Sequence, residues 1–278
     1  MSDFRLLALG DTVGRPGREA IEALVPPLVR DRRIDAVVVN AENVAGGSGL
    51  TETLAKKLLA VGIDVLTTGD HIWKKQAFAE YLAREPRVLR PFNYAPAAAG
   101  RGCTVVQTAR GVPIGVVNLL GRVFMDPVDC PFRGADAALR EIGSRARIIL
   151  VDIHAEATSE KTALAHYLDG RVTAVVGTHT HVQTADERIL PKGTAYLTDL
   201  GMTGPYDSVL GRKVEPVLYR FTTQMYAAFD VAERDARISG AIITADPDTG
   251  RAKAIERIQL AVPDAARPSF AAREDEAD

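Results

Sequence analysis

Residues 173–181, Thr-Ala-Val-Val-Gly-Thr-His-Thr-His, are the stretch around which this chain is organised. Residues 172–176 predict a short buried strand, and Gly177 then frees the backbone to turn. His179 and His181 follow where the chain leaves the sheet. Imidazoles that converge at the C-terminal end of a strand in an open α/β sheet are typical of a metal site. A pair of hydrogen-bonded loop histidines is the alternative interpretation.

The same pattern, a buried strand that ends in polar side chains, recurs upstream. Apolar runs at residues 5–10, 35–40, 64–68 and 147–153 each lead into such side chains. Helical spacing separates the first three runs, so we expect a βαβαβ unit with a parallel sheet. The carboxyl ends of parallel strands meet at one edge, and the polar residues there should meet in space. They are Asp11, Glu42, Asn43, Asp70, His71 and His154, beside His179 and His181.

Other segments complete the expected fold. Pro26-Pro27 should kink or break the helix at 18–30, and Thr51 should cap the helix at 52–61. Further helices are expected at 75–83, 136–144 and 159–168, the last with Ser159 as a candidate cap. Residues 103–107 and 113–120 predict a hairpin that starts a second sheet or an antiparallel extension, and residues 193–199 predict another strand. Residues 202–211 predict a loop, and residues 238–244 and 254–260 predict terminal antiparallel strands.

We expect one domain over residues 1–262, with a β-rich C-terminal part at 212–262 and a disordered tail at 263–278.

Composition indicates a globular protein with a full core. The chain has 278 residues, 46% of them hydrophobic and 25% charged. A net charge of −2 does not favour nucleic acid or membrane, so RNA is a partner that the charge does not indicate. We expect neither a signal peptide nor a membrane helix, because residues 1–5 lead directly into a strand and the apolar runs are shorter than the ~20 residues that a membrane helix needs. Cys103 and Cys130 should be reduced, which predicts a cytoplasmic location.

The polar strand ends suggest a particular metal chemistry. Mixed carboxylate and imidazole ligands suit Mn, Fe or Zn better than Mg or Ca. The ligands are too many for one ion, whereas two ions ~3.5–4 Å apart and bridged by one carboxylate would use them all. Such a pair turns a bridging water into hydroxide and clamps phosphate oxygens. Each residue alone could be a cap or a satisfied core group, but four of the five histidines lie at such ends, which favours a metal site.

Longer segments carry a family resemblance. They are GDTVGRPGR (10–18), NAENVAGGSGLT (40–51), GDHIW (69–73), LLGRVFMDPVDCPF (119–132), DIHAEATSEK (152–161) and residues 175–211. Together they resemble the YmdB-type bacterial calcineurin-like metallophosphoesterases over residues 5–262. The resemblance implies an α/β fold, an αββα sandwich with a dinuclear metal site at the C-terminal ends of the strands. It also implies hydrolysis of phosphodiesters, including 2′,3′- and 3′,5′-cyclic nucleotides, by a metal-bridging hydroxide.

The resemblance also implies roles for individual residues. Glu42 would bridge two metal ions, iron, manganese or both. His71 would contact the phosphate and protonate the leaving oxygen. The remaining ligands would be Asp11, Asn43 and His181 at one metal, and Asp70, His154 and His179 at the other.

One position departs from the family pattern. Asp70 stands where the family usually has asparagine, so three carboxylates would face the metals instead of two. We expect tighter metal binding and a less electrophilic site.

Other functions remain open at this point. The site could belong to a phosphomonoesterase or to a regulatory protein that binds a nucleotide or RNA without turnover. An amidohydrolase also uses His-x-His, but its motif lies on the first strand of a barrel. Edge strands could pair across subunits, so a homo-oligomer is an option. Arg122 and Lys161 could bind phosphate but are more often solvated, and Trp73 is expected to anchor the site loop by packing.

Overall fold

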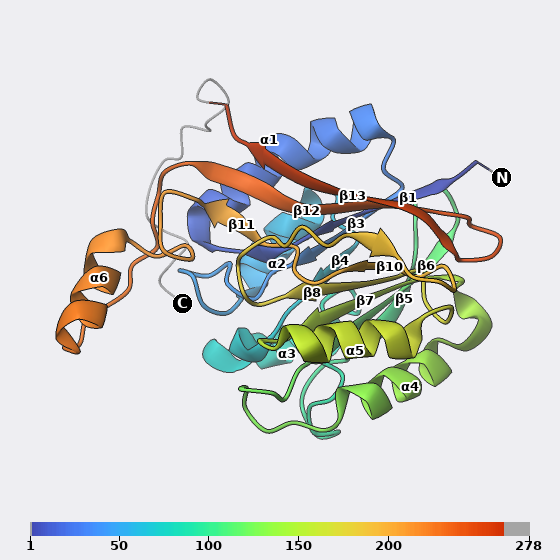
Figure 1. Cartoon of the computed structure of the whole chain (residues 1–278), viewed down its shortest axis with the longest axis horizontal. Helices are drawn as coiled ribbons and strands as arrows, with labels where there is room; N and C mark the ends of the chain where they lie inside the picture. Colours follow the sequence, from blue (N-terminus) through green and yellow to red (C-terminus); the bar gives the residue numbers. More distant parts are fainter. Residues whose placement is uncertain (1, 264–278) are drawn as a thin grey trace.

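Two mixed β-sheets pack face to face, and helices cover the outer face of each sheet (Figure 1). The computed structural model describes residues 2–263, so the predicted tail, apart from Pro263, lies outside the described residues. None of the helices in this part of the chain is long and apolar enough to span a bilayer.

The first sheet joins the N-terminal strands to the C-terminal ones. Its order is β2-β11-β12-β1-β3-β4, and β13 pairs with β12. The strands β1, β3 and β4 run parallel, whereas β12 lies antiparallel to β1. The bounds are β1 (Phe4–Leu9), β2 (Asp11–Thr12), β3 (Ala36–Asn40), β4 (Val65–Thr67), β11 (Met202–Pro205), β12 (Ala236–Ala245) and β13 (Ala252–Ala261).

The second sheet is built from the middle of the chain. Its order is β5-β6-β7-β8-β10-β9, with a parallel centre and an antiparallel strand at each edge. The predicted hairpin is confirmed as β5 and β6. The bounds are β5 (Cys103–Gln107), β6 (Pro113–Leu120), β7 (Ile148–His154), β8 (Ala174–Thr178), β9 (Arg188–Ile189) and β10 (Ala195–Leu197).

Alternation along the strands creates three apolar layers. On β1, Leu6 and Ala8 pack between the sheets, whereas Leu7 and Leu9 face α1 (Gly14–Arg32) and α2 (Glu52–Ala60). The outer face of the second sheet packs against α4 (Pro131–Ile142) and α5 (Thr158–Leu168). Central parallel strands are thus buried on both faces, which explains their continuous apolar runs. The predicted αββα sandwich is confirmed.

Several local predictions were wrong. Of the kink or break expected at Pro26-Pro27, the break does not occur: the first helix continues to Arg32, because Ile21 and Val25 before the prolines and Leu28 and Val29 after them pack on the same cluster. Ser159 does not cap α5, which begins at Thr158 after Ala157 without a side-chain cap.

The segment predicted as a loop at 202–211 contains β11, which pairs with both β2 and β12. Part of the predicted helix at 75–83 is realised as α3 (Phe78–Arg84), after the short 3-10 helix η1 (Asp70–Lys74). A second 3-10 turn, η2 (Gly143–Arg145), follows α4.

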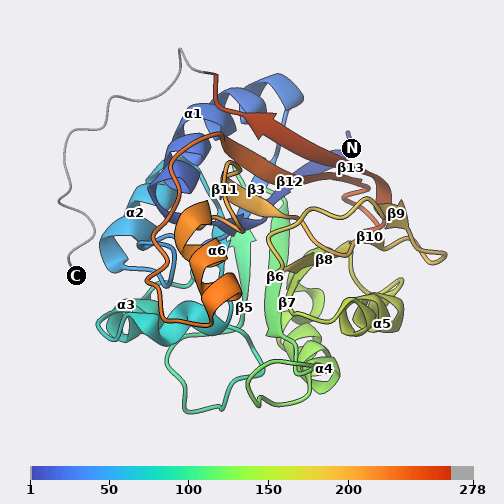
Figure 2. The same ribbon diagram turned by 60° about the vertical axis from the view of Figure 1, so that its left-hand side comes forward.

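The β-rich part expected at 212–262 holds β12 and β13 but begins with a helix. This helix, α6 (Val214–Thr223), stands out from the body of the molecule, and Figure 2 brings it to the front. Only Val217 of α6 is buried, whereas Phe221 is 77% exposed. Val214, Val217, Leu218 and Phe221 have helical spacing, so the sequence did carry a signal for this helix that the expectation of a β-rich part overlooked.

Candidate metal centre

All eight predicted site residues lie at the C-terminal ends of parallel strands or directly after them. Asp11 follows β1, the pair Glu42-Asn43 follows β3, and Asp70-His71 follows β4 at the start of η1. His154 is the last residue of β7, and the two remaining histidines follow β8. The two sheets therefore contribute to one cluster.

Four side chains form the first group of candidate ligands. Glu42, Asp70, His154 and His179 each offer one atom, and these atoms lie within 4.8 Å of one another. His154 Nε2 is 3.1 Å from Glu42 Oε2 and 3.1 Å from Asp70 Oδ1. His179 Nδ1 lies 3.0 Å from the same nitrogen. Two carboxylate oxygens and two imidazole nitrogens thus converge on one point.

A second group overlaps the first. Asp11, Glu42 and His181 offer atoms within 4.8 Å of one another, so Glu42 belongs to both groups. Asn43 lies beside this group, since its Nδ2 donates to Glu42 Oε1 at 2.7 Å and is 3.2 Å from His181 Nε2. Asn43 Oδ1 accepts a hydrogen bond from His71 Nδ1 at 2.8 Å. Asn43 therefore connects His71 to the cluster.

Each of the three clustered histidines has one ring nitrogen engaged by an outer partner. His154 Nδ1 lies 2.9 Å from Thr178 Oγ1, and His181 Nδ1 lies 3.0 Å from the Leu210 carbonyl oxygen. His179 Nε2 lies 3.3 Å from a carboxylate oxygen of Glu156. In a neutral ring, donation to these acceptors leaves the other nitrogen with a free lone pair toward the cluster. Outer partners of this kind orient metal-binding histidines in proteins.

The partner of His154 belongs to a buried polar network between the two sheets. Thr178 Oγ1 donates to Asp152 Oδ1 at 2.8 Å and is therefore an acceptor toward His154. Asp152 Oδ2 accepts from Asn40 Nδ2 at 3.1 Å and from the Thr67 hydroxyl. The predicted site did not include this network. Its one signal in the sequence is a carboxylate at position 152, inside an otherwise apolar strand.

Two glycines permit the close approach of these elements. A Cβ atom on Gly69 would lie 2.2 Å from Glu42 Oε2 and 2.4 Å from His154 Nε2. A Cβ on Gly177 would lie 1.9 Å from the Thr198 carbonyl oxygen. Any larger residue at position 69 would therefore fill the space in which the ligand atoms converge.

The carboxylates create a strongly negative environment. Burial raises the pKa of Asp11 to about 6, against the effect of His181 and His154. Burial also disfavours a charge on His154, but Glu42, Asp70 and Asp11 outweigh it and raise the pKa of His154 to about 10. Burial opposes ionisation of Asp70 as well, yet the histidines hold its pKa well below the usual range. A positive charge, either a proton on His154 or a cation, therefore balances the cluster.

The donor set fits a metal ion. Asp11 Oδ1 is buried and accepts no hydrogen bond from any residue in the range 2–263. Oxygen and imidazole nitrogen ligands together suit metals of the Mn, Fe and Zn class. The residues present could thus hold metal, and the sharing of Glu42 is compatible with two ions.

His71 differs from the other histidines in its environment. Its side chain is 31% exposed, and its Nδ1 lies 3.4 Å from Glu42 Oε1. The Glu42 carboxylate raises the pKa of His71, with partial burial opposing it and Asp70 adding to it. His71 therefore tends to carry a proton at the open side of the cluster.

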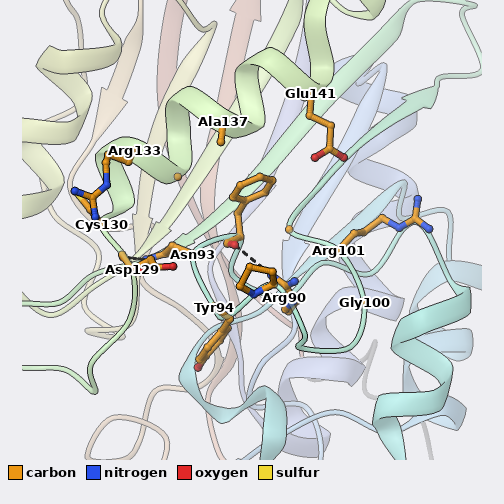
Figure 3. A pocket seen from close by; sticks show the side chains of 14 residues that line it. Arg90, Asn93, Tyr94, Gly100, Arg101, Asp129, Cys130, Arg133, Ala137 and Glu141 are labelled. Atoms are coloured by element: carbon orange, nitrogen blue, oxygen red, sulfur yellow. Dashed lines mark hydrogen bonds between the residues drawn. The ribbon is translucent and has the colours of Figure 1, made fainter.

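A cavity of about 530 Å³ lies between α4 and the segment 90–102 (Figure 3). None of the eight predicted site residues lines it. Tyr94, on its wall, contacts Trp73 edge to face with 5.6 Å between the ring centroids. Trp73 belongs to η1, so this contact packs the loop that carries Asp70 and His71, in the role predicted for Trp73.

Lys161 is neither solvated nor available to phosphate. Its side chain is fully buried, and Nζ donates to Asp199 Oδ2 at 2.8 Å. The expectation of a surface lysine was wrong because α5 packs this face against the second sheet. Periodicity alone does not reveal a buried ion pair.

The chain is similar to proteins of known sequence and structure over nearly its full length. The sequence model of a family described as YmdB-like protein matches residues 7–258. A relative from Bacillus subtilis (strain 168), named 2′,3′-cyclic-nucleotide 2′-phosphodiesterase, is 47% identical over 257 residues, which are 92% of this chain and 97% of the relative.

Two solved structures are also similar. A hypothetical protein from Thermus thermophilus superposes with a TM-score of 0.87 at 43% identity, covering 94% of this chain and 100% of that chain. A phosphatase from Mycoplasma pneumoniae superposes with a TM-score of 0.86 at 33% identity, covering 94% of each chain. The expected family resemblance is confirmed, and this chain belongs to the YmdB-like family.

Proposed function

We propose that this protein is a metal-dependent phosphodiesterase that hydrolyses 2′,3′- or 3′,5′-cyclic nucleotides or similar small phosphodiesters. The observation that carries the proposal is the pair of ligand groups that share Glu42. Membership of the YmdB-like family supports it, as does the 47% identity to a relative named as a cyclic-nucleotide phosphodiesterase.

The proposed ligands divide between two metal ions, iron, manganese or both. When bound, such a pair supplies a nucleophile from water and stabilises the charge that develops on the phosphate. Asp11 and His181 would serve one ion through a carboxylate oxygen and a ring nitrogen, together with Asn43, whose amide lies beside them. Asp70 and Glu42 would serve the other. His154 and His179 complete that second set.

Protonation of the leaving oxygen falls to His71 in this proposal. Hydrolysis of a cyclic phosphodiester breaks one P–O bond, and the departing sugar oxygen needs a proton. His71 Nδ1 is occupied by Asn43 Oδ1, so Nε2 is the atom that can donate. The raised pKa of His71 favours the protonated ring, and its partial exposure leaves it accessible to substrate.

We also propose that residues 1–262 act as one domain. Ligands from both sheets must keep a fixed spacing, and the Asp152 network joins the sheets directly beneath them.

The test is turnover with and without metal. Hydrolysis of bis-p-nitrophenyl phosphate and of 2′,3′-cyclic AMP is measured with added Mn²⁺ and after chelation, alongside elemental analysis. We expect metal-dependent turnover with about two metals per chain, and loss of that turnover in His179→Ala. His166→Ala is the matched control, because His166 is exposed on α5 and belongs to neither ligand group.

The outcomes separate the competing functions. Faster hydrolysis of a phosphomonoester than of either diester would indicate a phosphomonoesterase. Bound metal without turnover would indicate a regulatory protein, and absence of metal from the protein would refute the proposal.

A further inference from the structure

The segment that carries His179 and His181 has an unusual backbone. The φ angle is 102° at His179 and 64° at His181. Residues with a side chain rarely adopt positive φ, and such conformations persist only where the surroundings hold them. The two histidines belong to different ligand groups, so this backbone sends one ring into each group.

Thr180, between the histidines, is tied to a buried carboxylate. Its backbone N–H donates to Asp199 Oδ2 at 3.2 Å, and its hydroxyl donates to the same oxygen at 2.8 Å. Asp199 is fully buried after the end of β10, and its Oδ1 accepts from the Gly201 N–H at 2.8 Å. The carboxylate thus anchors the centre of the strained segment to the neighbouring strand.

The Asp199 carboxylate also forms an ion pair with a buried lysine of α5. Lys161 Nζ reaches Asp199 Oδ2 at 2.8 Å from α5, and neither side chain is exposed. A buried ion pair without its partner would leave a desolvated charge, so each member keeps the other in place. Neither Lys161 nor Asp199 belongs to the two groups of candidate ligands.

We propose that Lys161 and Asp199 are positioning residues for the metal centre. Through Thr180 they hold the His-Thr-His segment in its strained conformation and so direct one imidazole into each ligand group. This inference rests on the proposed function for its metal, but it adds residues that contact neither metal nor substrate. It predicts a specific signature, since loss of the anchor should weaken both metal sites together.

Thr180→Val tests the anchor with little change of volume. It removes the hydroxyl and its hydrogen bond to Asp199, whereas Thr180→Ser keeps the hydroxyl and is the rescue control. Mn²⁺ is titrated calorimetrically into the full chain after chelation. We expect Thr180→Val to bind Mn²⁺ about 10–100-fold more weakly at both sites, the loss that is typical when residues supporting metal ligands are removed. Thr180→Ser should bind Mn²⁺ with nearly the affinity of the unchanged protein.

Two further variants make the result specific. Thr178→Val removes the hydroxyl that contacts His154 and Asp152, and of these only His154 is a candidate ligand, in one group, so this variant should weaken one site more than the other. The double variant Lys161→Met with Asp199→Asn replaces the buried pair with neutral groups, avoids an unpaired charge, and should weaken both sites. Hydrogen exchange of segment 178–182 in the chelated protein should quicken in this double variant, which reports the loss of the anchor without metal.

The results distinguish the two proposals. If the unchanged protein takes up no Mn²⁺, the proposed function fails and the positioning role fails with it. If it binds two ions while Thr180→Val and the double variant bind them equally well, only the positioning role is overturned. Weakening of a single site by Thr180→Val would also overturn it.

Discussion

Thr178→Val should be among the most destabilising conservative substitutions in this protein. The hydroxyl of Thr178 donates to Asp152 Oδ1 at 2.8 Å and faces His154 Nδ1 at 2.9 Å. Among residues 2–263, Asp152 Oδ1 has no other hydrogen-bond partner, and His154 Nδ1 has besides Thr178 only an ion-pair contact of 3.6 Å with Asp11 Oδ1. Valine fills the same volume but offers neither a donor nor an acceptor.

The magnitude follows from the atoms left unpaired. A buried polar group without its partner costs about 1–3 kcal/mol, and more if charged, so two such groups amount to about 2–6 kcal/mol. The raised pKa of His154 makes it a charged donor at neutral pH, which favours the upper part of this range. Thr178→Ser keeps the hydroxyl and removes one buried methyl group, for about 1 kcal/mol.

Urea unfolding of the chelated protein measures the free energy of unfolding of both variants. Chelation removes the contribution of metal binding to stability, which would otherwise mask the network. We expect the valine variant to lie clearly below the serine variant, with similar slopes against urea. If the two variants differ by less than about 0.5 kcal/mol, the hydroxyl does not serve both partners and the reasoning is refuted.

Three further predictions concern the metal centre. The pKa of His154 is raised to about 10, whereas a histidine that binds a metal must be neutral. Metal uptake at neutral pH should therefore release a proton, and Mn²⁺ affinity should rise by up to about tenfold per pH unit. Calorimetry in buffers of different ionisation enthalpy measures the proton release, and its absence would contradict the prediction. Asp70→Asn removes one carboxylate and should weaken Mn²⁺ binding while raising turnover per bound metal; unchanged metal content and kinetics would show that this charge has no effect. His71→Asn should lower kcat for 2′,3′-cyclic AMP by about 10²–10⁴-fold while both metals stay bound. It should lower kcat for bis-p-nitrophenyl phosphate less, because p-nitrophenolate leaves without needing a proton. Equal losses of kcat on the two substrates would argue against an acid role for His71.

The sequence was sufficient to predict the cluster because one geometric rule brings it together. Parallel strands end at the same edge of their sheet, so polar residues after buried runs converge even when Asp11 and His179 are 168 positions apart. The same runs predicted the central strands, since alternation and burial are local properties.

The features that the sequence did not predict share a different physical cause. Asp152, Thr178 and Asn40 form hydrogen bonds only because two sheets pack face to face, and no local period reports which residues meet across that interface. Lys161 resembles a surface residue in its helix until its buried partner Asp199 is known. The segment at 202–205 lacks the β-branched pattern of a strand and becomes one because β2 and β12 flank it.

The position of β12 has a consequence for how the chain is made. This strand, at residues 236–245, fills the place beside β1, at residues 4–9, so β1 cannot complete its pairing until residues 236–245 have been synthesised. Until then the apolar edge of β1 is open on the nascent chain, and an open edge is where misassociation begins. Since β11 and β2 join the same sheet through β12, the edge that carries Asp11 is completed only after β12 has been synthesised.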